Sequence, residues 1–155
     1  MKYAIISMLF LCQSWAITIK VLDPCNGEVV VQEEVPIDSS SDVGTLTINF
    51  LNKHQIPFSG TNRGMNSILN TPTGMESIDT LSDHSLLAFG QCFKLDGMIP
   101  NTMPHETTVL DEHQNLAWYY GYTGMLNGEW GEPCIPAWEA PTEAQLYQQF
   151  CNNRD

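Results

Sequence analysis

Basic residues are scarce in this chain. It has 155 residues, and its 6 lysines and arginines stand against 18 aspartates and glutamates, which gives a formal net charge of −12. A surface of this charge repels polyanions, so nucleic acid is excluded as a partner. The acidic residues are spread along the chain without a long run, a pattern typical of a solvated surface.

The sequence also lacks the short motifs that identify common enzymes and metal sites. His-Glu-x-x-His, Cys-x-x-Cys and Gly-x-Ser-x-Gly are all absent. No internal repeat or low-complexity linker divides the chain, so we expect a single domain. Beyond the first 16 residues no hydrophobic run is long enough to cross a bilayer, so we expect no membrane insertion of the mature chain.

Residues 1–16 predict a secretory signal peptide. Lys2 gives the start of the chain a positive charge, an apolar stretch follows over 3–12, and small residues stand at Ser14 and Ala16, the two positions that signal peptidase reads. The mature chain would begin near Ile17 and would be periplasmic or secreted.

The pattern of apolar residues predicts an α+β domain. Residues 17–22 and a segment from Val29 read as the strands of an opening hairpin, joined by a turn at 23–27. A helix is expected over 42–54, because its apolar residues recur at helical spacing. Further strands are expected at 65–69, 89–95 and 116–122, and loops or irregular segments at 57–64, 74–87, 98–113 and 130–138.

This order of elements predicts a β-grasp-like mixed sheet with one helix packed across one face, over residues 17–123. Residues 124–155 are expected to form a C-terminal extension that is tethered by a disulfide and packs on the same domain. The extension would end in a short helix that starts near Pro141, where Thr142 and Gln145 fit a capping box.

Four cysteines remain when Cys12 is removed with the predicted signal peptide. An even number in an oxidising compartment predicts two disulfides, for which three pairings exist. In a β-grasp sheet the first and last strands lie side by side and parallel. This favours a bond between Cys25 and Cys134, which leaves Cys92 to hold the terminal helix through Cys151.

Several segments resemble, in order, one known family. Val43–Leu51 is a helix after an opening hairpin, and Met65–Asn70 is similar to an apolar-x-Ser-Ile-x-Gly/Asn strand. Phe89–Gly97 resembles an aromatic-x-aromatic-x-apolar-Asn-Gly strand and turn. Thr107–Leu110 and Asn115–Tyr120 are similar to a closing loop and an x-Ile/Leu-x-Trp-x-Tyr strand. Together these segments resemble the transcobalamin-like C-terminal domain family.

The resemblance covers roughly residues 17–123 and implies a β-grasp-like module of exported bacterial proteins, most of them of unknown function. The same module is the second domain of vitamin B12 carriers. Those carriers enclose cobalamin between this module and a helical barrel that is not seen here, so no cofactor is expected. The sequence departs from the family at Asp96, where Asn is favoured, and at Gln114-Asn115, where Gly-Asp is usual.

The histidines offer weak candidates for a metal site. His105 and Glu106 are adjacent, and His113 follows in the same predicted loop beside two further carboxylates, Asp111 and Glu112. Two histidines and a carboxylate could hold zinc or copper. Without a recognised ligand spacing, solvated loop histidines are the simpler interpretation, and no metal site is assigned. Separately, the segment Ser82–Ser85 contains Ser, Asp and His, but adjacent residues do not form a catalytic triad, so a turn is expected there.

The aromatic residues give the best candidate for a binding surface. Trp118 lies on one face of a predicted strand, and we expect it to pack under the helix because a mixed sheet must bury one face. Tyr119 lies on the other face and is expected to be exposed, as are the loop tryptophans. The candidate ligand-binding residues are Tyr119, Tyr122, Trp130 and Trp138.

The sequence therefore predicts an exported, non-catalytic binding or interaction module, with a small molecule or an envelope protein as its partner. No catalytic residue is assigned. One alternative is a metal-assisted hydrolase that uses His105, His113 and nearby carboxylates, and another is a purely structural component of the cell envelope.

Overall fold

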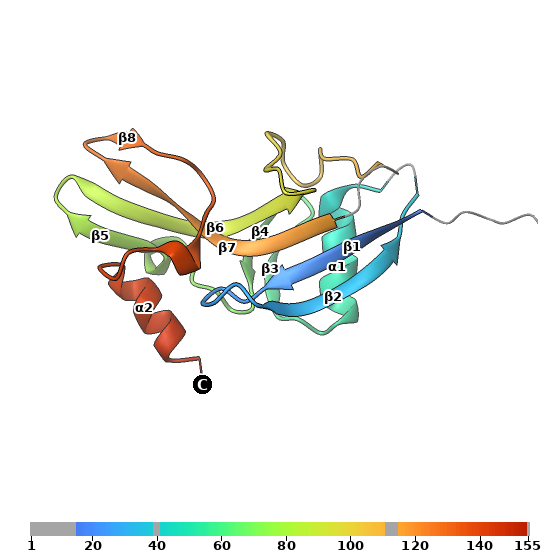
Figure 1. Ribbon diagram of the computed structural model, residues 1–155, viewed down its shortest axis with the longest axis horizontal. Coiled ribbons are helices and arrows are strands. Elements are labelled where there is room, and N and C mark those ends of the chain that lie inside the picture. The colour runs from blue at the N-terminus through green and yellow to red at the C-terminus, as the bar shows by residue number, and fades with distance from the viewer. Residues whose placement is uncertain (1–14, 39–40, 111–114, 155) are drawn as a thin grey trace, which may run out of the picture.

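The computed structural model describes residues 15–38, 41–110 and 115–154 (Figure 1). The predicted signal peptide lies outside these residues except for Trp15 and Ala16, and it stays a prediction. The strands are β1 (Ala16–Leu22), β2 (Val29–Pro36), β3 (Phe58–Thr61), β4 (Gly64–Ile68), β5 (Ile78–Ser82), β6 (Ser85–Leu95), β7 (Asn115–Leu126), β8 (Glu129–Trp130) and β9 (Ile135–Pro136). The helices are α1 (Val43–Lys53) and α2 (Gln145–Asn152), with short 3-10 turns η1 (Gly74–Ser77) and η2 (Ala137–Glu139).

Seven strands form one mixed sheet, in which the order β2-β1-β7-β6-β5 is extended by β8 and β9 along β7. β1 pairs with β2 antiparallel and with β7 parallel, and β7 pairs antiparallel with β6. Figure 1 shows α1 behind this sheet. The predicted fold class, a β-grasp-like α+β domain with a disulfide-tethered C-terminal extension, is confirmed.

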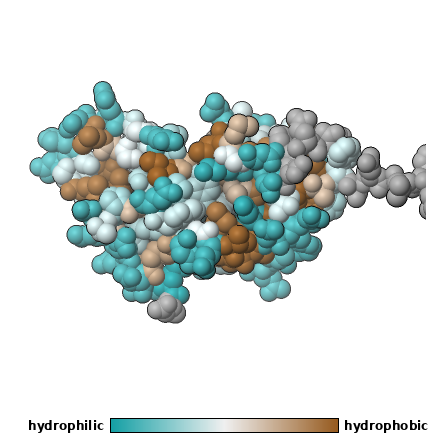
Figure 2. Space-filling model, in the orientation of Figure 1, coloured by the Kyte–Doolittle hydropathy of each residue, from teal (hydrophilic) through white to brown (hydrophobic). Residues whose placement is uncertain are grey.

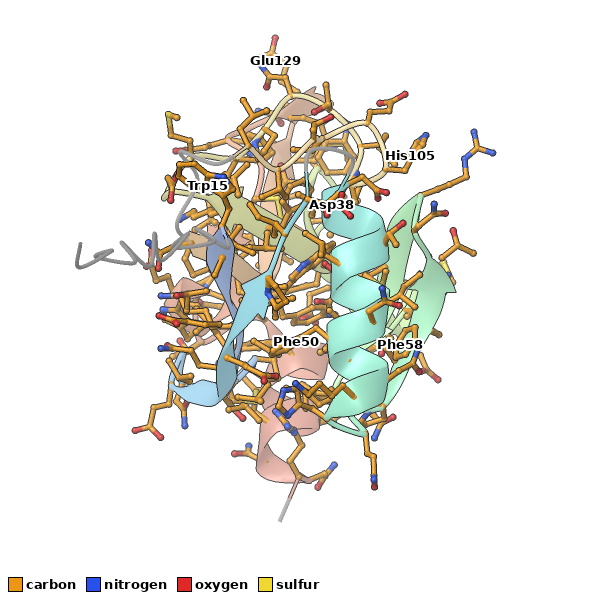
Figure 3. The ribbon with its side chains drawn as sticks, turned by 90° about the vertical axis from the view of Figure 1, so that its right-hand side faces the viewer. Trp15, Asp38, Phe50, Phe58, His105 and Glu129 are labelled. Carbon is orange, nitrogen blue, oxygen red and sulfur yellow. A yellow bond between two sulfur atoms is a disulfide. The ribbon has the colours of Figure 1, made fainter. Side chains whose placement is uncertain are left out.

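Asp42 caps the N-terminus of helix α1, and its carboxylate accepts a hydrogen bond from the Thr45 backbone N–H at 2.8 Å. Its buried side chains pack on the sheet, and Trp118 is 1% exposed in this core. The prediction that Trp118 packs under the helix is therefore confirmed. In Figure 3, α1 stands between the β1–β2 hairpin and the separate β3–β4 hairpin, with Phe50 and Phe58 on different sides of the helix. The core residues are Ile17, Ile19, Val21, Val43, Leu46, Phe50, Leu51, Met65, Ile68, Phe93, Leu95, Val109, Leu116 and Trp118.

A second apolar cluster lies under the C-terminal extension. Phe89 stacks on Tyr147 of α2, with ring centroids 5.2 Å apart, and on Tyr120 at 5.7 Å. The predicted capping box of α2 is wrong, because Thr142 donates its hydroxyl proton to the Glu143 carboxylate at 3.4 Å and contacts no backbone N–H of the helix. Asp79 of β5 supplies the cap instead.

The disulfides are Cys25–Cys151 and Cys92–Cys134, so the predicted pairing is wrong. After β7 the chain turns back, and β9 runs antiparallel beside the middle of β7. This return carries Cys134 to Cys92 on β6. The turn after β1 meets α2 instead, where the Tyr147 hydroxyl donates to the Pro24 carbonyl oxygen at 3.0 Å.

Three segments expected to be irregular contain strands. β3 lies within 57–64, β5 lies within 74–87, and β9 lies within 130–138. β5 gives no clear strand signal because its buried position, Asp79, is a charged residue. Among the helices in the described part of the chain, none is long and apolar enough to cross a membrane.

Candidate functional site

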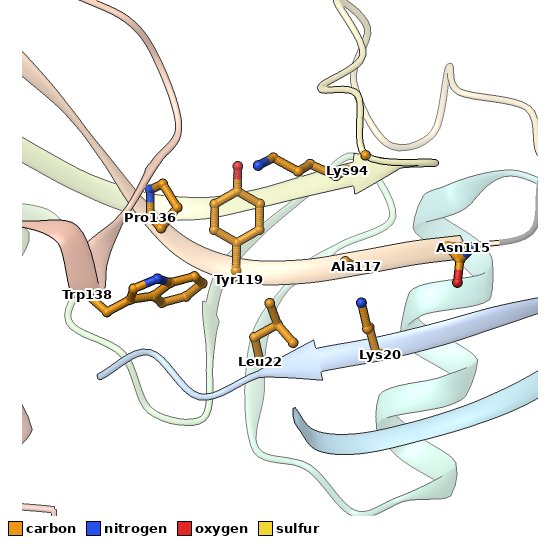
Figure 4. Close-up of a pocket in the computed structure, with 9 residues that line it drawn as sticks. Lys20, Leu22, Lys94, Asn115, Ala117, Tyr119, Pro136 and Trp138 are labelled. Atoms are coloured by element: carbon orange, nitrogen blue, oxygen red, sulfur yellow. The ribbon is translucent and has the colours of Figure 1, made fainter. Parts of the chain in front are cut away.

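A pocket of about 190 Å³ opens on the face of the sheet opposite α1 (Figure 4). It lies where β7 changes its neighbour: β7 pairs with β1 up to Trp118 and with β9 from Gly121, which leaves Tyr119 and Tyr120 between the two partners. We call it the Tyr119 pocket. Its lining residues are Lys20, Leu22, Lys94, Gly97, Asn115, Ala117, Tyr119, Pro136 and Trp138.

Strand alternation places these side chains together. In β1 the odd-numbered residues from Ile17 to Val21 face the core, so Lys20 and Leu22 face the other way. In β7 Trp118 faces the core, and Ala117 and Tyr119 therefore point into the pocket. The face that carries the pocket is mostly hydrophilic, with several small hydrophobic patches (Figure 2).

Two aromatic rings form one wall of the pocket. The rings of Tyr119 and Trp138 are 6.1 Å apart between centroids and tilted by 57°. Gly27 leaves room for the indole, because a Cβ at that glycine would lie 2.8 Å from Cε2 of Trp138. The Tyr119 hydroxyl donates to the Cys134 carbonyl oxygen at 2.8 Å. The Tyr119 ring is therefore held by a hydrogen bond, and the Trp138 ring packs closely on Gly27.

Burial raises the pKa of Tyr119 to about 12. Its hydroxyl therefore stays protonated at neutral pH and is committed as a donor to Cys134. The lining residues described above include no histidine, cysteine, serine or carboxylate. The pocket thus offers apolar contact, amide groups and ammonium groups, and no pairing of a nucleophile with a general base.

Two lysines stand on either side of a small residue. Lys20 of β1 and Lys94 of β6 are both register partners of Ala117 on the strand between them. The two backbone positions are thus two strand spacings apart, about 10 Å. Lys94 places Nζ 5.1 Å from the centroid of the Tyr119 ring, a cation–π contact. The methyl group of Ala117 leaves the space between the lysines open (Figure 4).

The structure divides the four predicted ligand-binding residues into two groups. Tyr119 and Trp138 line the pocket together, although the prediction that Tyr119 is exposed is wrong, since the residue as a whole is only 3% exposed. Tyr122 faces the other way and contacts Phe89 at 5.5 Å between centroids. Trp130 is 57% exposed on β8, away from the pocket.

Sequence reasoning missed Lys20 and Lys94. A usable signal was present, because both lysines sit at outward positions of strands in a chain with few basic residues. What the sequence did not show is that β1 and β6 lie on the two sides of the same strand, β7.

The proposed metal residues are only partly described. His105 places Nε2 3.8 Å from a Glu106 carboxylate oxygen, and its buried Nδ1 has no hydrogen-bond partner within the described residues. His113, with Asp111 and Glu112, lies outside the described residues. Within the described ranges no group of three or more His, Cys, Asp or Glu side chains could hold a metal ion. The metal-assisted hydrolase therefore gains no supporting observation. Ser82–Ser85 forms the β5–β6 turn, as predicted.

Comparison with protein-family models gives no match for this chain, and comparison with curated proteins gives no significant match. Among solved structures, the chain is similar to a crystal structure from Ruminococcus gnavus ATCC 29149 that is named a "putative metal binding protein". The identity is 12%, the TM-score is 0.39, and the match covers 68% of this chain and 94% of the other. A likeness this distant assigns neither a family nor a ligand.

Proposed function

We propose that this chain is an exported, non-catalytic binding module whose ligand occupies the Tyr119 pocket. The observation that carries the proposal is the pocket itself, with two packed aromatic rings and no paired catalytic groups among its lining residues. Ligand sites are concave and mostly apolar, with a few polar groups that orient the ligand. The Tyr119 pocket has each of these properties.

Export is supported by the predicted signal peptide and by the two disulfides, which are typical of proteins from oxidising compartments. The likeness to the transcobalamin-like C-terminal domain family is part of this proposal, and the β-grasp-like sheet agrees with it. Cobalamin itself is not proposed as the ligand. A pocket of about 190 Å³ is smaller than sites for drug-sized molecules, which begin at about 300 Å³. The expected ligand is the size of an amino acid or a single ring.

The test is a titration of ¹⁵N-labelled protein with phenylacetate, followed by amide chemical shifts. We expect saturable shifts centred on Ala117, Tyr119 and the Trp138 indole. The blocking variant is Ala117→Leu, which fills the floor of the pocket and removes no existing contact. The matched control is Thr123→Leu, on the same strand and the same face but outside the pocket.

We expect Ala117→Leu to abolish the shifts and Thr123→Leu to leave them unchanged. Shifts scattered over the surface, or equal binding by both variants, would overturn the proposal.

A further inference from the structure

We infer that the ligand of the Tyr119 pocket is an anion with a flat apolar body, its charged group held by Lys20 and Lys94 and its body by Tyr119 and Trp138. This inference rests on the proposed function and names the class of ligand. It rests on the placement of the two lysines, on the fact that neither pairs with a carboxylate within the described residues, and on the shape of the floor between them.

The placement of the lysines follows from the strand register. The row across the sheet reads Gln32, Lys20, Ala117, Lys94, so one small residue separates the two ammonium-bearing side chains. No acidic residue stands in this row. Like charges side by side on a sheet are unfavourable. Each lysine has a flexible four-carbon stem, so the two ammonium groups can converge on one anionic group above Ala117.

Two of the other basic residues have carboxylate partners, whereas Arg63, like the pocket lysines, forms no ion pair within the described residues. Lys53 forms an ion pair with Glu33, and Arg154 forms one with Asp23. Within the described residues neither pocket lysine forms an ion pair, although the chain carries 18 acidic residues. An acidic chain that leaves two neighbouring lysines without carboxylates presents a local positive site in a repulsive surrounding field.

The carboxylate that follows Lys94 on the same face is already engaged. Asp96 accepts a hydrogen bond from the Asn115 backbone N–H at 2.9 Å, which closes the end of β6 against the start of β7. It is not among the lining residues of the pocket. The side of the pocket next to Asp96 is instead lined by Gly97 and Asn115, whose amide can donate a further hydrogen bond to an anion.

The shape of the pocket determines what the uncharged part of the ligand must be. From the lysine row, the floor continues over Leu22 and Tyr119 to Pro136 and Trp138, all of which offer apolar surface. A neutral ring would fill this part but would leave the ammonium groups unpaired, and a cation would be repelled by them. An aryl or indolyl carboxylate, sulfonate or phosphate satisfies both ends.

The experiment compares three probes with the same ring: phenylacetate, phenylacetamide and phenethylamine. We expect phenylacetate to bind at least about fivefold more tightly than phenylacetamide, a ratio that charge pairs with two half-buried lysines can supply, and phenethylamine to show no binding. The preference should shrink as salt is raised from about 0.02 M to about 0.5 M, because salt screens exposed charges.

Variants then test the lysines. Lys20→Met and Lys94→Met should each reduce the preference for phenylacetate over phenylacetamide, and the double variant should abolish it. The matched control is Lys53→Met. It removes a lysine of α1 that is paired with Glu33, and it should leave the preference unchanged. Melting temperatures of all variants verify that each is folded.

Two results would overturn the inference without touching the proposed function: equal binding of acid and amide, or an unchanged preference in the double lysine variant. Inorganic phosphate that competes as strongly as phenylacetate would overturn the part of the inference that requires a flat body. If none of the three rings bound, or if Ala117→Leu left binding intact, the proposed function itself would fail.

Discussion

Trp118 donates its indole N–H to the hydroxyl oxygen of Thr47 at 2.7 Å, a contact between residues 71 positions apart. Thr47 in turn donates its proton to the Val43 carbonyl oxygen one helical turn earlier, also at 2.7 Å. Both residues are buried. This chain of two hydrogen bonds fixes α1 on the sheet at the point where the largest core side chain meets the helix.

Replacing Thr47 with Val keeps the volume and removes the acceptor, which leaves the indole N–H unsatisfied in the core. We expect the free energy of unfolding to fall by about 1–3 kcal/mol. Urea unfolding measures the change. The control is Thr45→Val, which makes the same replacement at an exposed position of the same helix. Equal losses in the two variants would show that helix propensity, rather than the Trp118 contact, is responsible.

The N-terminus of helix α2 is capped by a side chain from another element. Asp79 of β5, which is 4% exposed, accepts hydrogen bonds from the backbone N–H groups of Leu146 at 2.8 Å and Tyr147 at 3.1 Å. A carboxylate at this position also favours the positive end of the helix dipole. It replaces the cap that the residues before the helix do not provide.

The variant Asp79→Ala should therefore loosen α2 before the rest of the fold. We expect a loss of about 1–2 kcal/mol, the usual size of a helix cap, with faster amide hydrogen exchange at Leu146 and Tyr147. Asp83→Ala, in the exposed turn after β5, is the matched control. If exchange in α2 were unchanged in Asp79→Ala, the cap would contribute nothing to holding the helix.

The sequence predicted the elements whose burial follows a simple period. The alternation of Ile17, Ile19 and Val21 identifies β1, and the helical spacing of Leu46 and Phe50 identifies α1. β5 was not predicted as a strand, because its buried residue is an acid. The strand carries a cap for a helix 67 positions later, and that relationship exists only in three dimensions.

The disulfide pairing was predicted wrongly and the pocket was not predicted, and both failures have the same cause. Strand polarity alone suggested that Cys134 would end near Cys25, but β9 folds back along β7 to reach Cys92. Likewise the outward positions of Lys20 and Lys94 could be read from alternation, whereas their common neighbour Ala117 depends on register. Non-local pairing, which the pattern of a single segment does not encode, decides both outcomes.

Buried tyrosines predict how stability responds to alkaline pH. Burial raises the pKa of Tyr119 to about 12 and that of Tyr147 to about 12, where the charge of Asp23 adds to the effect, and it also raises the pKa of Tyr120. In the unfolded chain tyrosine ionises near pH 10, so the folded state holds protons that the unfolded state has lost. Their contribution is complete below pH 10 and is lost progressively from pH 10 to about 12.

We therefore expect the contribution of these tyrosines to the free energy of unfolding to stay constant up to about pH 9.5 and then to fall. Each such tyrosine contributes at most about 1.4 kcal/mol per pH unit. Urea unfolding at pH 8 to 11.5, with absorbance of tyrosinate near 295 nm, measures both sides of the linkage. Tyr119→Phe should make the fall shallower. A stability that does not change up to pH 11.5 would contradict the burial of these hydroxyl groups.

The two disulfides close loops of different length, and their removal should differ accordingly. Cys25–Cys151 spans 126 positions and Cys92–Cys134 spans 42. The chain-entropy relation gives about 5 and about 4 kcal/mol as upper values for the two. We expect the Cys25→Ser/Cys151→Ser variant to lose more stability and to free α2, and the Cys92→Ser/Cys134→Ser variant to loosen β9.

The pairing can be verified by mass mapping of non-reduced protein, provided that the right proteases are used. Trypsin cannot separate Cys134 from Cys151, because no lysine or arginine lies between Lys94 and Arg154. Cleavage after Glu139 or Glu143 by a glutamate-specific protease does separate them. We expect one linked peptide pair with Cys25 and Cys151 and another with Cys92 and Cys134. A link from Cys25 to Cys134 would mean that β9 does not return along β7, and the wall of the Tyr119 pocket that includes Pro136 and Trp138 would then be lost.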